Sequence, residues 1–182
     1  MLTGFFLFFQ SGVELLINNW TTTFLQNKLA VTPEKALYAL SFQLVGLTVA
    51  RLLLGRLLKK FSSLVVLTVS LLLIAVSNLV MYNTSSYNVA FIALILTGAG
   101  LAGGFPVILG YIGQLYARLS GTAFSIAFVI ALTGNTIINY SFGLVQAQYG
   151  IQYLPVAMVL CIICMLIVLF VIRNNIASRV KL

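Results

Sequence analysis

The sequence predicts an all-α membrane protein in which six helices cross the bilayer. Of its 182 residues, 62% are hydrophobic and only 7% are charged, and the mean hydropathy is +1.13. A water-soluble domain of this size needs far more charge to cover its surface. The second observation is the pattern. Apolar stretches of roughly 20 residues, the length that crosses the hydrocarbon, recur six times and are separated by short polar connections.

The six predicted spans occupy nearly the whole chain, so we expect residues 1–182 to form one transmembrane bundle. The spans cover about 4–25, 36–55, 63–82, 89–113, 122–146 and 154–172. Because three is an odd number, the first three spans and the last three enter the membrane in opposite orientations. This arrangement predicts two inverted three-helix repeats, as in many secondary transporters, although the two triplets have no strong residue-level identity.

Basic residues near the ends of the spans predict the orientation, because cytoplasmic loops are enriched in Lys and Arg. One side carries Arg56, Lys59, Lys60, Arg118, Arg173, Arg179 and Lys181, and the other carries Lys28 and Lys35. We therefore expect a multi-pass protein of the cell inner (plasma) membrane with both termini in the cytoplasm. Arg51 lies inside the second span, and we expect its long side chain to extend toward the basic side.

Composition also argues against several classes of function. The net charge of +8 is spread over short connections and forms no dense basic face, so no nucleic-acid partner is expected. The chain has no His, and its two cysteines, Cys161 and Cys164, lie in an apolar run where they serve as packing residues. No metal or other cofactor is therefore expected. A single acid within the spans also gives an enzyme too few groups for acid–base or nucleophilic chemistry.

Polar residues in the first span are the leading candidates for a solute site. Gln10, Glu14 and Asn18 recur every four residues, which places them along one helical face. Asn19 and Trp20 follow at the end of this stripe. A carboxylic acid in hydrocarbon must be neutral, paired or open to an aqueous cavity, so Glu14 is also the candidate for proton coupling. The alternatives are a hydrogen-bonded network between helices for the stripe and an interfacial anchor for Trp20.

A second polar face is predicted in the fifth span, where Asn135 and Asn139 are four residues apart. Asn side chains both donate and accept hydrogen bonds, which suits a hydroxyl-rich ligand. Gln43 in the second span is a further candidate for substrate binding. The same amides could instead join neighbouring helices.

The fourth span is rich in glycine and contains one proline. Gly100 and Gly104 have the spacing of a close helix–helix approach. Pro106 has no backbone N–H to donate, so a kink is expected near it. Two interpretations stand: tight helix packing, or a helix that flexes as a gate.

Several segments together resemble the carboxyl-terminal half of the major facilitator superfamily. Residues 55–61, Gly-Arg-Leu-Leu-Lys-Lys-Phe, resemble a degenerate copy of its cytoplasmic loop motif, Gly-x-Leu-x-Asp-Arg-x-Gly-Arg, with Lys59 where the motif has Asp. The segments GVELLINNWTTTFL, GAGLAGGFPVILGYIGQLY and SGTAFSIAFVIALTGNTIINYSFGLV resemble fucose permease-like members. The resemblance covers essentially the whole chain.

The resemblance implies a secondary transporter that takes up a small polar solute, a sugar in particular, together with protons by alternating access. In such transporters two six-helix halves rock around a central site. The implied partners are the solute, protons, membrane lipid and an N-terminal six-helix half. Because one half cannot enclose the site, the chain is expected to be a fragment, a split-gene product or a subunit of a dimer. The alternative function is a non-transporting membrane scaffold or assembly subunit.

Overall fold

The computed structural model describes residues 2–179, and these residues contain helices and no strand. The helices, in chain order, are α1 (Leu2–Leu29), α2 (Pro33–Lys60), α3 (Ser63–Asn83), α4 (Tyr87–Leu101), α5 (Gly104–Leu115), η1 (Ala117–Leu119), α6 (Ser120–Tyr149), η2 (Ile151–Tyr153) and α7 (Leu154–Arg179). Lys181 and the side chain of Arg179, both used to predict the orientation, lie outside what the structure describes.

Six long helical rods form the bundle, since α4 and α5 follow one another as the two parts of a single rod. Five rods are long and apolar enough to cross a membrane: Pro33–Lys60, Ser63–Asn83, Tyr87–Leu115, Ala117–Tyr149 and Ile151–Arg173. The expected segments therefore correspond to helices, but most helices extend beyond the predicted ends. They do so because polar residues continue each helix into the membrane–water interface, where apolar length does not reveal the end of the helix.

The sixth rod, α1, is the exception because it is too polar to count as a span by hydropathy. It has 28 residues, which at 1.5 Å per residue is about 42 Å, more than the hydrocarbon thickness. Much of its surface is covered by protein: Phe6, Leu7, Leu16 and Leu25 are fully buried. A helix surrounded by other helices does not need an apolar surface all round, so hydropathy alone underestimates it.

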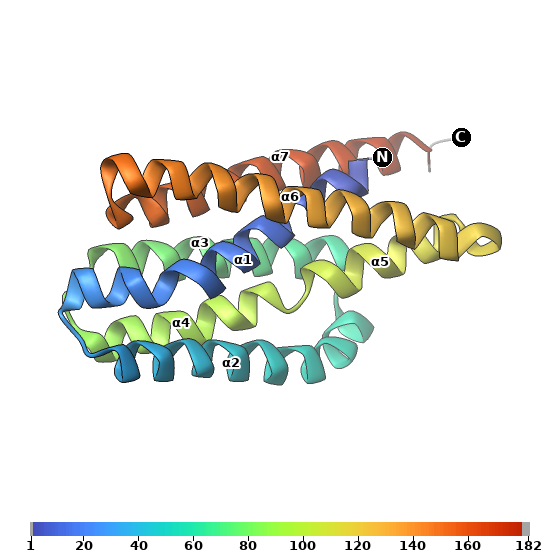
Figure 1. Ribbon diagram of the computed structural model, residues 1–182. Coiled ribbons are helices and arrows are strands. Elements are labelled where there is room, and N and C mark those ends of the chain that lie inside the picture. The colour runs from blue at the N-terminus through green and yellow to red at the C-terminus, as the bar shows by residue number, and fades with distance from the viewer. Residues whose placement is uncertain (1, 180–182) are drawn as a thin grey trace.

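The rods pack in two groups with α1 passing between them (Figure 1). On one side α1 contacts α6 and α7, and α4 contacts α2 and α3 on the other, while α3 also contacts α7. The start of α1 and the end of α7 lie at the same end of the bundle (Figure 1). An even number of crossings requires this, so the geometry agrees with termini on one side of the membrane.

Two close crossings, each with a glycine from both helices, hold the bundle together. At the α2–α4 crossing, a Cβ on Gly98 would collide with the Gln43 carbonyl oxygen, and one on Gly46 with the Ile95 carbonyl oxygen. At the α1–α6 crossing, a Cβ on Gly134 would collide with the backbone of Phe8.

The reciprocal glycine of the α1–α6 crossing is Gly12, which faces the Ile138 side chain. In lipid, where the solvent is as apolar as the side chains, such backbone proximity is a main source of helix association. The two crossings therefore fix the spacing of two rods within each group.

The fourth rod breaks at Ala102–Gly103, between α4 and α5. Pro106 cannot donate to the Ala102 carbonyl four residues earlier, so the ordinary helical bond is missing at this point. The Ala102 amide bonds the Ala99 carbonyl at 3.3 Å instead, as in a tighter turn. The predicted kink is thus a break of the helix.

The break also separates the two glycines that the sequence placed on one face. Gly100 lies against Ser70 and Ile74 of α3, whereas Gly104 lies against Gln10 of α1. In a regular helix, two residues four positions apart lie on nearly the same side. The turn between Gly100 and Gly104 interrupts the helix, so the two glycines face in different directions. Each glycine therefore makes room for a different helix.

At the opposite end of the bundle from the termini, Lys28 joins the ends of α1 and α3. Its amine donates to the Met81 carbonyl oxygen at 3.1 Å and to that of Tyr82, and it lies 5.1 Å from the centroid of the Tyr82 ring. A cation is favoured at a helix C-terminus, where carbonyl groups have no helical partner. Partial burial lowers the pKa of the Lys28 amine below its usual range.

We predict that Gly98→Ala destabilises the bundle by about 1–3 kcal/mol, because the new methyl group meets a backbone carbonyl that cannot move away. Denaturant titration in mixed micelles measures the free energy of unfolding. The control is Gly110→Ala in the same rod, where nothing lies within 4 Å of the added Cβ. That change should be neutral or stabilising by up to about 1 kcal/mol. Equal losses in both variants would contradict the packing role of Gly98.

Candidate functional site

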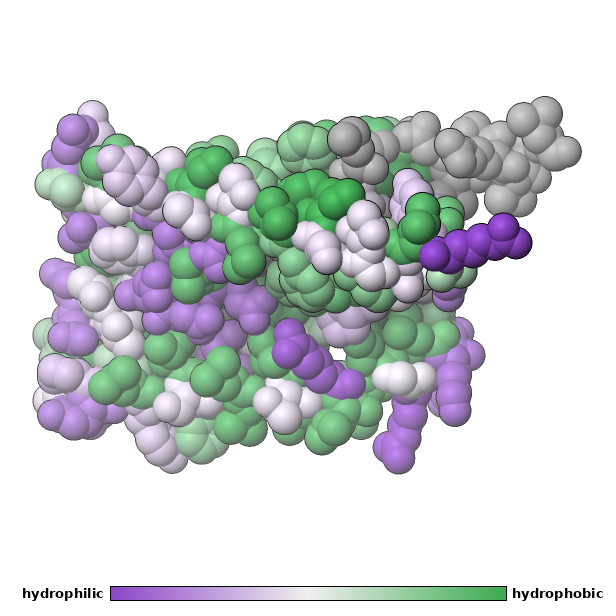
Figure 2. All heavy atoms as spheres, turned by 45° about the vertical axis from the view of Figure 1, so that its right-hand side comes forward, coloured by the Kyte–Doolittle hydropathy of each residue, from purple (hydrophilic) through white to green (hydrophobic). Residues whose placement is uncertain are grey.

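A hollow lined mainly by polar side chains opens on one face of the bundle, among α1, α2, α5 and α6. Its volume is about 320 Å³, and we call it the polar hollow. Its lining residues are Ser11, Glu14, Leu15, Asn18, Arg51, Phe105 and Asn135. A space-filling view shows hydrophilic side chains in the middle of the bundle surface as well as at its two ends (Figure 2). Polar side chains in the middle of a membrane-spanning bundle lie away from the water at the two membrane surfaces. Their presence in the hollow therefore needs another explanation.

The polar side chains of this hollow differ from many other polar side chains of the bundle in their hydrogen bonding. Elsewhere, hydroxyl groups such as those of Thr48 and Thr133 bond the carbonyl one turn back, and the Asn78 amide bonds the Pro155 carbonyl at 2.9 Å. Among the described residues, no hydrogen bond joins the side chains of the polar hollow to one another or to their neighbours. Their donors and acceptors are therefore free to bind something that enters the hollow.

Glu14 and Arg51 bring opposite charges into the polar hollow from α1 and α2. Glu14 is half-buried and Arg51 is exposed. Within residues 2–179 no ion pair of 4.0 Å or less joins them. They are close enough to share one hollow, and opposite charges attract strongly where water is scarce. When both side chains are ionised, their charges sum to zero. The Glu14 carboxylate and the Arg51 guanidinium still have no hydrogen-bond partner among the described residues.

Gln10, predicted with this stripe, turns away from the hollow. It is buried, and its Nε2 donates to the Leu101 carbonyl oxygen at 3.3 Å, while its side chain lies against Gly104. Leu101 is the last residue of α4, so this carbonyl has lost its helical partner at the break. Each step of four residues turns a helix by about 40°. Gln10 and Asn18 therefore point in directions about 80° apart.

Asn139 is the centre of a second polar group, next to the hollow. Its Oδ1 accepts from Trp20 Nε1 at 3.2 Å and from Asn19 Nδ2 at 3.4 Å, and its Nδ2 donates to the Asn135 carbonyl at 3.1 Å. The Trp20 ring also meets the edge of Phe142, with ring centroids 5.3 Å apart. These bonds join α1 to α6, the structural alternative that the sequence left open.

Gln43 does not reach the polar hollow. It is completely buried in α2, where its backbone faces Gly98, and neither atom of its side-chain amide has a partner among the described residues. Of the predicted binding residues, the structure therefore brings three together in the hollow: Glu14, Asn18 and Asn135. Asn19, Trp20 and Asn139 form the adjoining group, and Gln10 and Gln43 lie inside the bundle.

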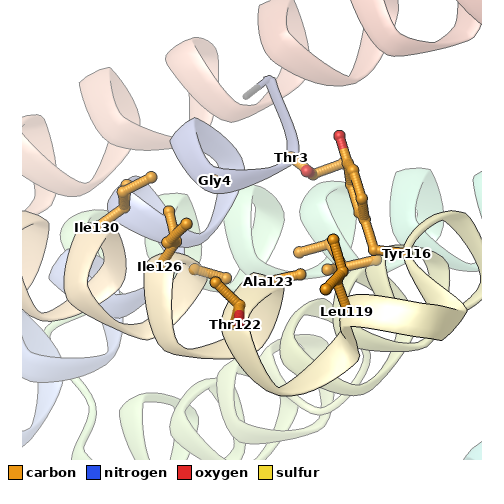
Figure 3. A pocket seen from close by; sticks show the side chains of 10 residues that line it. Thr3, Gly4, Tyr116, Leu119, Thr122, Ala123, Ile126 and Ile130 are labelled. Atoms are coloured by element: carbon orange, nitrogen blue, oxygen red, sulfur yellow. The ribbon is translucent and has the colours of Figure 1, made fainter.

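A second hollow of about 300 Å³ lies between the start of α1 and the α5–α6 region (Figure 3). Its lining includes Ile112, Leu119, Ile126 and Ile130, with Tyr116 at one edge. Its surface is mostly apolar, so it offers few groups that could orient a polar solute. The polar hollow is the better candidate for a solute site.

The family model of the Major Facilitator Superfamily matches residues 1–181. The chain belongs to the Major Facilitator Superfamily. This is a family of secondary transporters, not of enzymes, so a small molecule that crosses the membrane is the expected ligand. No curated protein matches the chain. The family membership confirms the coarse part of the resemblance and gives the polar hollow a functional context.

Sequence reasoning missed four lining residues of this transporter: Ser11, Leu15, Arg51 and Phe105. Arg51 was expected to extend toward the basic end of α2, and the structure shows that it also lines the hollow that holds Glu14. A signal for it was present, since Glu14 and Arg51 are the only acid and the only base within the predicted spans. Charged residues inside a membrane usually pair or face a common cavity. Ser11, Leu15 and Phe105 had no such signal.

Gln10→Leu should destabilise the transporter by about 1 kcal/mol, because it leaves the Leu101 carbonyl without a partner at the helix break. The free energy of unfolding in mixed micelles tests this. Gln114→Leu is the matched control, since that exposed side chain makes no hydrogen bond within the described residues. If both variants unfold like the parent, the Gln10 bond has no structural weight.

Proposed function

We propose that the chain is one half of a secondary transporter that moves a small polar solute of the sugar type across the inner membrane, coupled to protons. The observation that carries this proposal is the set of unbonded polar side chains in the polar hollow. An unsatisfied polar group in hydrocarbon costs several kcal/mol. Five such side chains on one face therefore favour a surface that meets water and a polar solute over one that meets lipid.

A polar face of this kind also needs a second protein surface to cover it. A hollow that is open on one side cannot shield a solute from lipid and from the water on both sides of the membrane. The residues of the polar hollow come from four rods, α1, α2, α5 and α6, so the cover must span the same width. A second six-helix bundle, the N-terminal half that the resemblance implies, has suitable dimensions. We propose it as the partner, with the solute held between the two.

The packing pattern supports two inverted repeats within this half. In such a repeat the first three rods correspond to the last three. The rod α1 corresponds to α4–α5, α2 corresponds to α6, and α3 corresponds to α7. The α1–α6 contact then becomes the α4–α2 contact, α1–α7 becomes α4–α3, and α3–α7 becomes itself.

The glycines follow the same correspondence. Gly12 and Gly134 join α1 to α6, and Gly98 and Gly46 join α4 to α2 in the corresponding way. A repeat related by a two-fold axis in the membrane plane produces this correspondence. Repeats of that kind let one bundle rock against another, which is the basis of alternating access.

Glu14 is the proposed proton-coupling group. It is the only acid within the predicted spans, and it lines the hollow where a solute would bind. The other acid, Glu34, lies exposed at the start of α2.

The end of the bundle that holds the start of α1 (Figure 1) also carries most of the described basic residues: Arg56, Lys59, Lys60, Arg118 and Arg173. Under the positive-inside rule, that end faces the cytoplasm.

Glu14→Gln should reduce uphill accumulation in proteoliposomes to the level of empty vesicles, while exchange of labelled for unlabelled solute stays within about twofold of the parent. The carboxamide cannot take up a proton, but it keeps the shape of the side chain. Tritiated sugars and sugar acids serve as solutes. Glu34→Gln, the same change at the exposed acid, should leave both activities unchanged. Normal uphill accumulation by Glu14→Gln would remove this residue from proton coupling.

Cysteine labelling separates the transporter from the alternative of a non-transporting scaffold. In a background without Cys161 and Cys164, Asn135→Cys should react with a membrane-impermeant maleimide, because it faces the polar hollow. Leu160→Cys, on an exposed apolar part of α7, should react at least about tenfold more slowly, because a thiol in lipid does not ionise. A scaffold without an aqueous cavity would protect both positions equally.

A further inference from the structure

We propose that Arg51 binds the carboxylate of the transported solute, so that the substrate is a hydroxylated monocarboxylate that enters together with one proton. The inference rests on the proposed transport function and names the chemical class of its substrate. The geometry that points to it is a free guanidinium and a free carboxyl group in one hollow, surrounded by neutral hydrogen-bonding side chains and one aromatic ring.

Arg51 is well placed to recognise an anion. It lies in α2 more than one turn before the basic residues Arg56 and Lys59 that mark the end of that helix, and its side chain lines the polar hollow. The part of the chain that the structure describes holds no ion pair that satisfies it. Guanidinium presents parallel N–H groups that match the two oxygens of a carboxylate. A cation without a partner in a membrane hollow is costly, and an anionic solute removes that cost.

The remaining lining residues suit the rest of such a solute. Ser11, Asn18 and Asn135 offer a hydroxyl and two amides, none of which is engaged by another side chain in the described bundle. These groups can both donate to and accept from solute hydroxyls. Phe105 supplies an apolar surface for a carbon skeleton. The hollow volume of about 320 Å³ is at the lower end of small-molecule sites, which fits a solute of sugar size.

Charge balance connects the carboxylate to the proton. In the empty hollow, ionised Glu14 and charged Arg51 sum to zero. When the carboxylate binds Arg51 and a proton binds Glu14, the sum is again zero. A low-dielectric environment penalises net charge, so the empty and fully loaded states can change conformation, and the half-loaded states are disfavoured.

No other lining residue of the hollow, from α1, α5 or α6, carries a titratable side chain. One proton should therefore accompany each monoanion. It binds to the Glu14 carboxylate from one solution and leaves to the other.

A neutral sugar would behave differently at the same site. Protonation of Glu14 without an anion leaves Arg51 uncompensated, so each cycle would carry one positive charge across the membrane. Transport of a neutral sugar should then respond to membrane potential. Transport of a monocarboxylate with one proton should respond to the pH gradient alone.

The binding experiment uses matched pairs of probes on the assembled transporter: glucuronate with glucose, galacturonate with galactose, and gluconate with sorbitol. The members of each pair differ only in the carboxylate. We expect at least one acid to bind roughly 10- to 100-fold more tightly than its neutral counterpart at pH 6, the range expected for a charge-assisted hydrogen bond. Arg51→Gln should remove this preference. Arg56→Gln, on the same helix but outside the hollow, should retain it.

A second measurement separates an anchoring role of Arg51 from a merely structural one. Affinity of the parent for the acid should fall as pH rises, because the anion then competes with ionised Glu14 for the arginine. In Glu14→Gln this pH dependence should disappear while the acid still binds. In proteoliposomes, a pH gradient should drive uptake of the acid, and a potassium diffusion potential with valinomycin should not.

The outcomes distinguish the substrate class from the transport function. Proton-driven uptake of a neutral sugar, with no response to any of the three acids, overturns the carboxylate inference and leaves the proposed function standing. An acid preference that survives Arg51→Gln, or uptake driven by membrane potential, also overturns it. Failure of every probe to bind overturns the inference, and failure of the Asn135 labelling experiment overturns the transport function independently.

Discussion

Hydrocarbon cannot hydrogen-bond, and this constraint determines which polar groups of the bundle are structural and which are free for function. Where the helix breaks at Ala102–Gly103, Gln10 bonds the freed Leu101 carbonyl. Where α1 passes α6, Asn139 accepts from Trp20. The buried Gln43 amide and the polar hollow both lack such bonds in the described part of the chain, but only the hollow opens on the surface of the bundle. That opening identifies the face where water or a solute takes the place of lipid.

The same constraint explains the character of α1. Its hydropathy is too low for a span judged in isolation, yet it passes through the middle of the bundle, where α6, α7 and α2 cover much of its surface. Its apolar residues pack against these helices, and Glu14 and Asn18 lie on the remaining side. The one rod too polar to count as a span is thus the central one, because only a helix sheltered from lipid can carry a polar stripe.

Glycine and charge then set the mechanism that we propose. Gly98 and Gly134 bring helix backbones together in two corresponding crossings, so each group of rods can behave as a rigid unit. Between these units, Glu14 and Arg51 give the hollow one titratable and one permanent charge. A proton and an anion that arrive together leave the sum of charges unchanged. Packing thus holds this half together, and electrostatics determines which loaded states of the transporter can change conformation.

The sequence by itself determined the class of protein, because apolar length and the scarcity of charge leave no alternative to a helical membrane bundle. It also predicted Glu14, Asn18 and Asn135, which line one hollow, since polar residues stand out against an apolar background. It could not place Arg51 beside Glu14, separate Gln10 from the stripe, or pair Gly12 and Gly134 with Gly98 and Gly46. These relations join residues far apart in the chain, and only the crossing of packed helices brings them together. Periodicity reports the faces of one helix, whereas tertiary structure decides what each face meets.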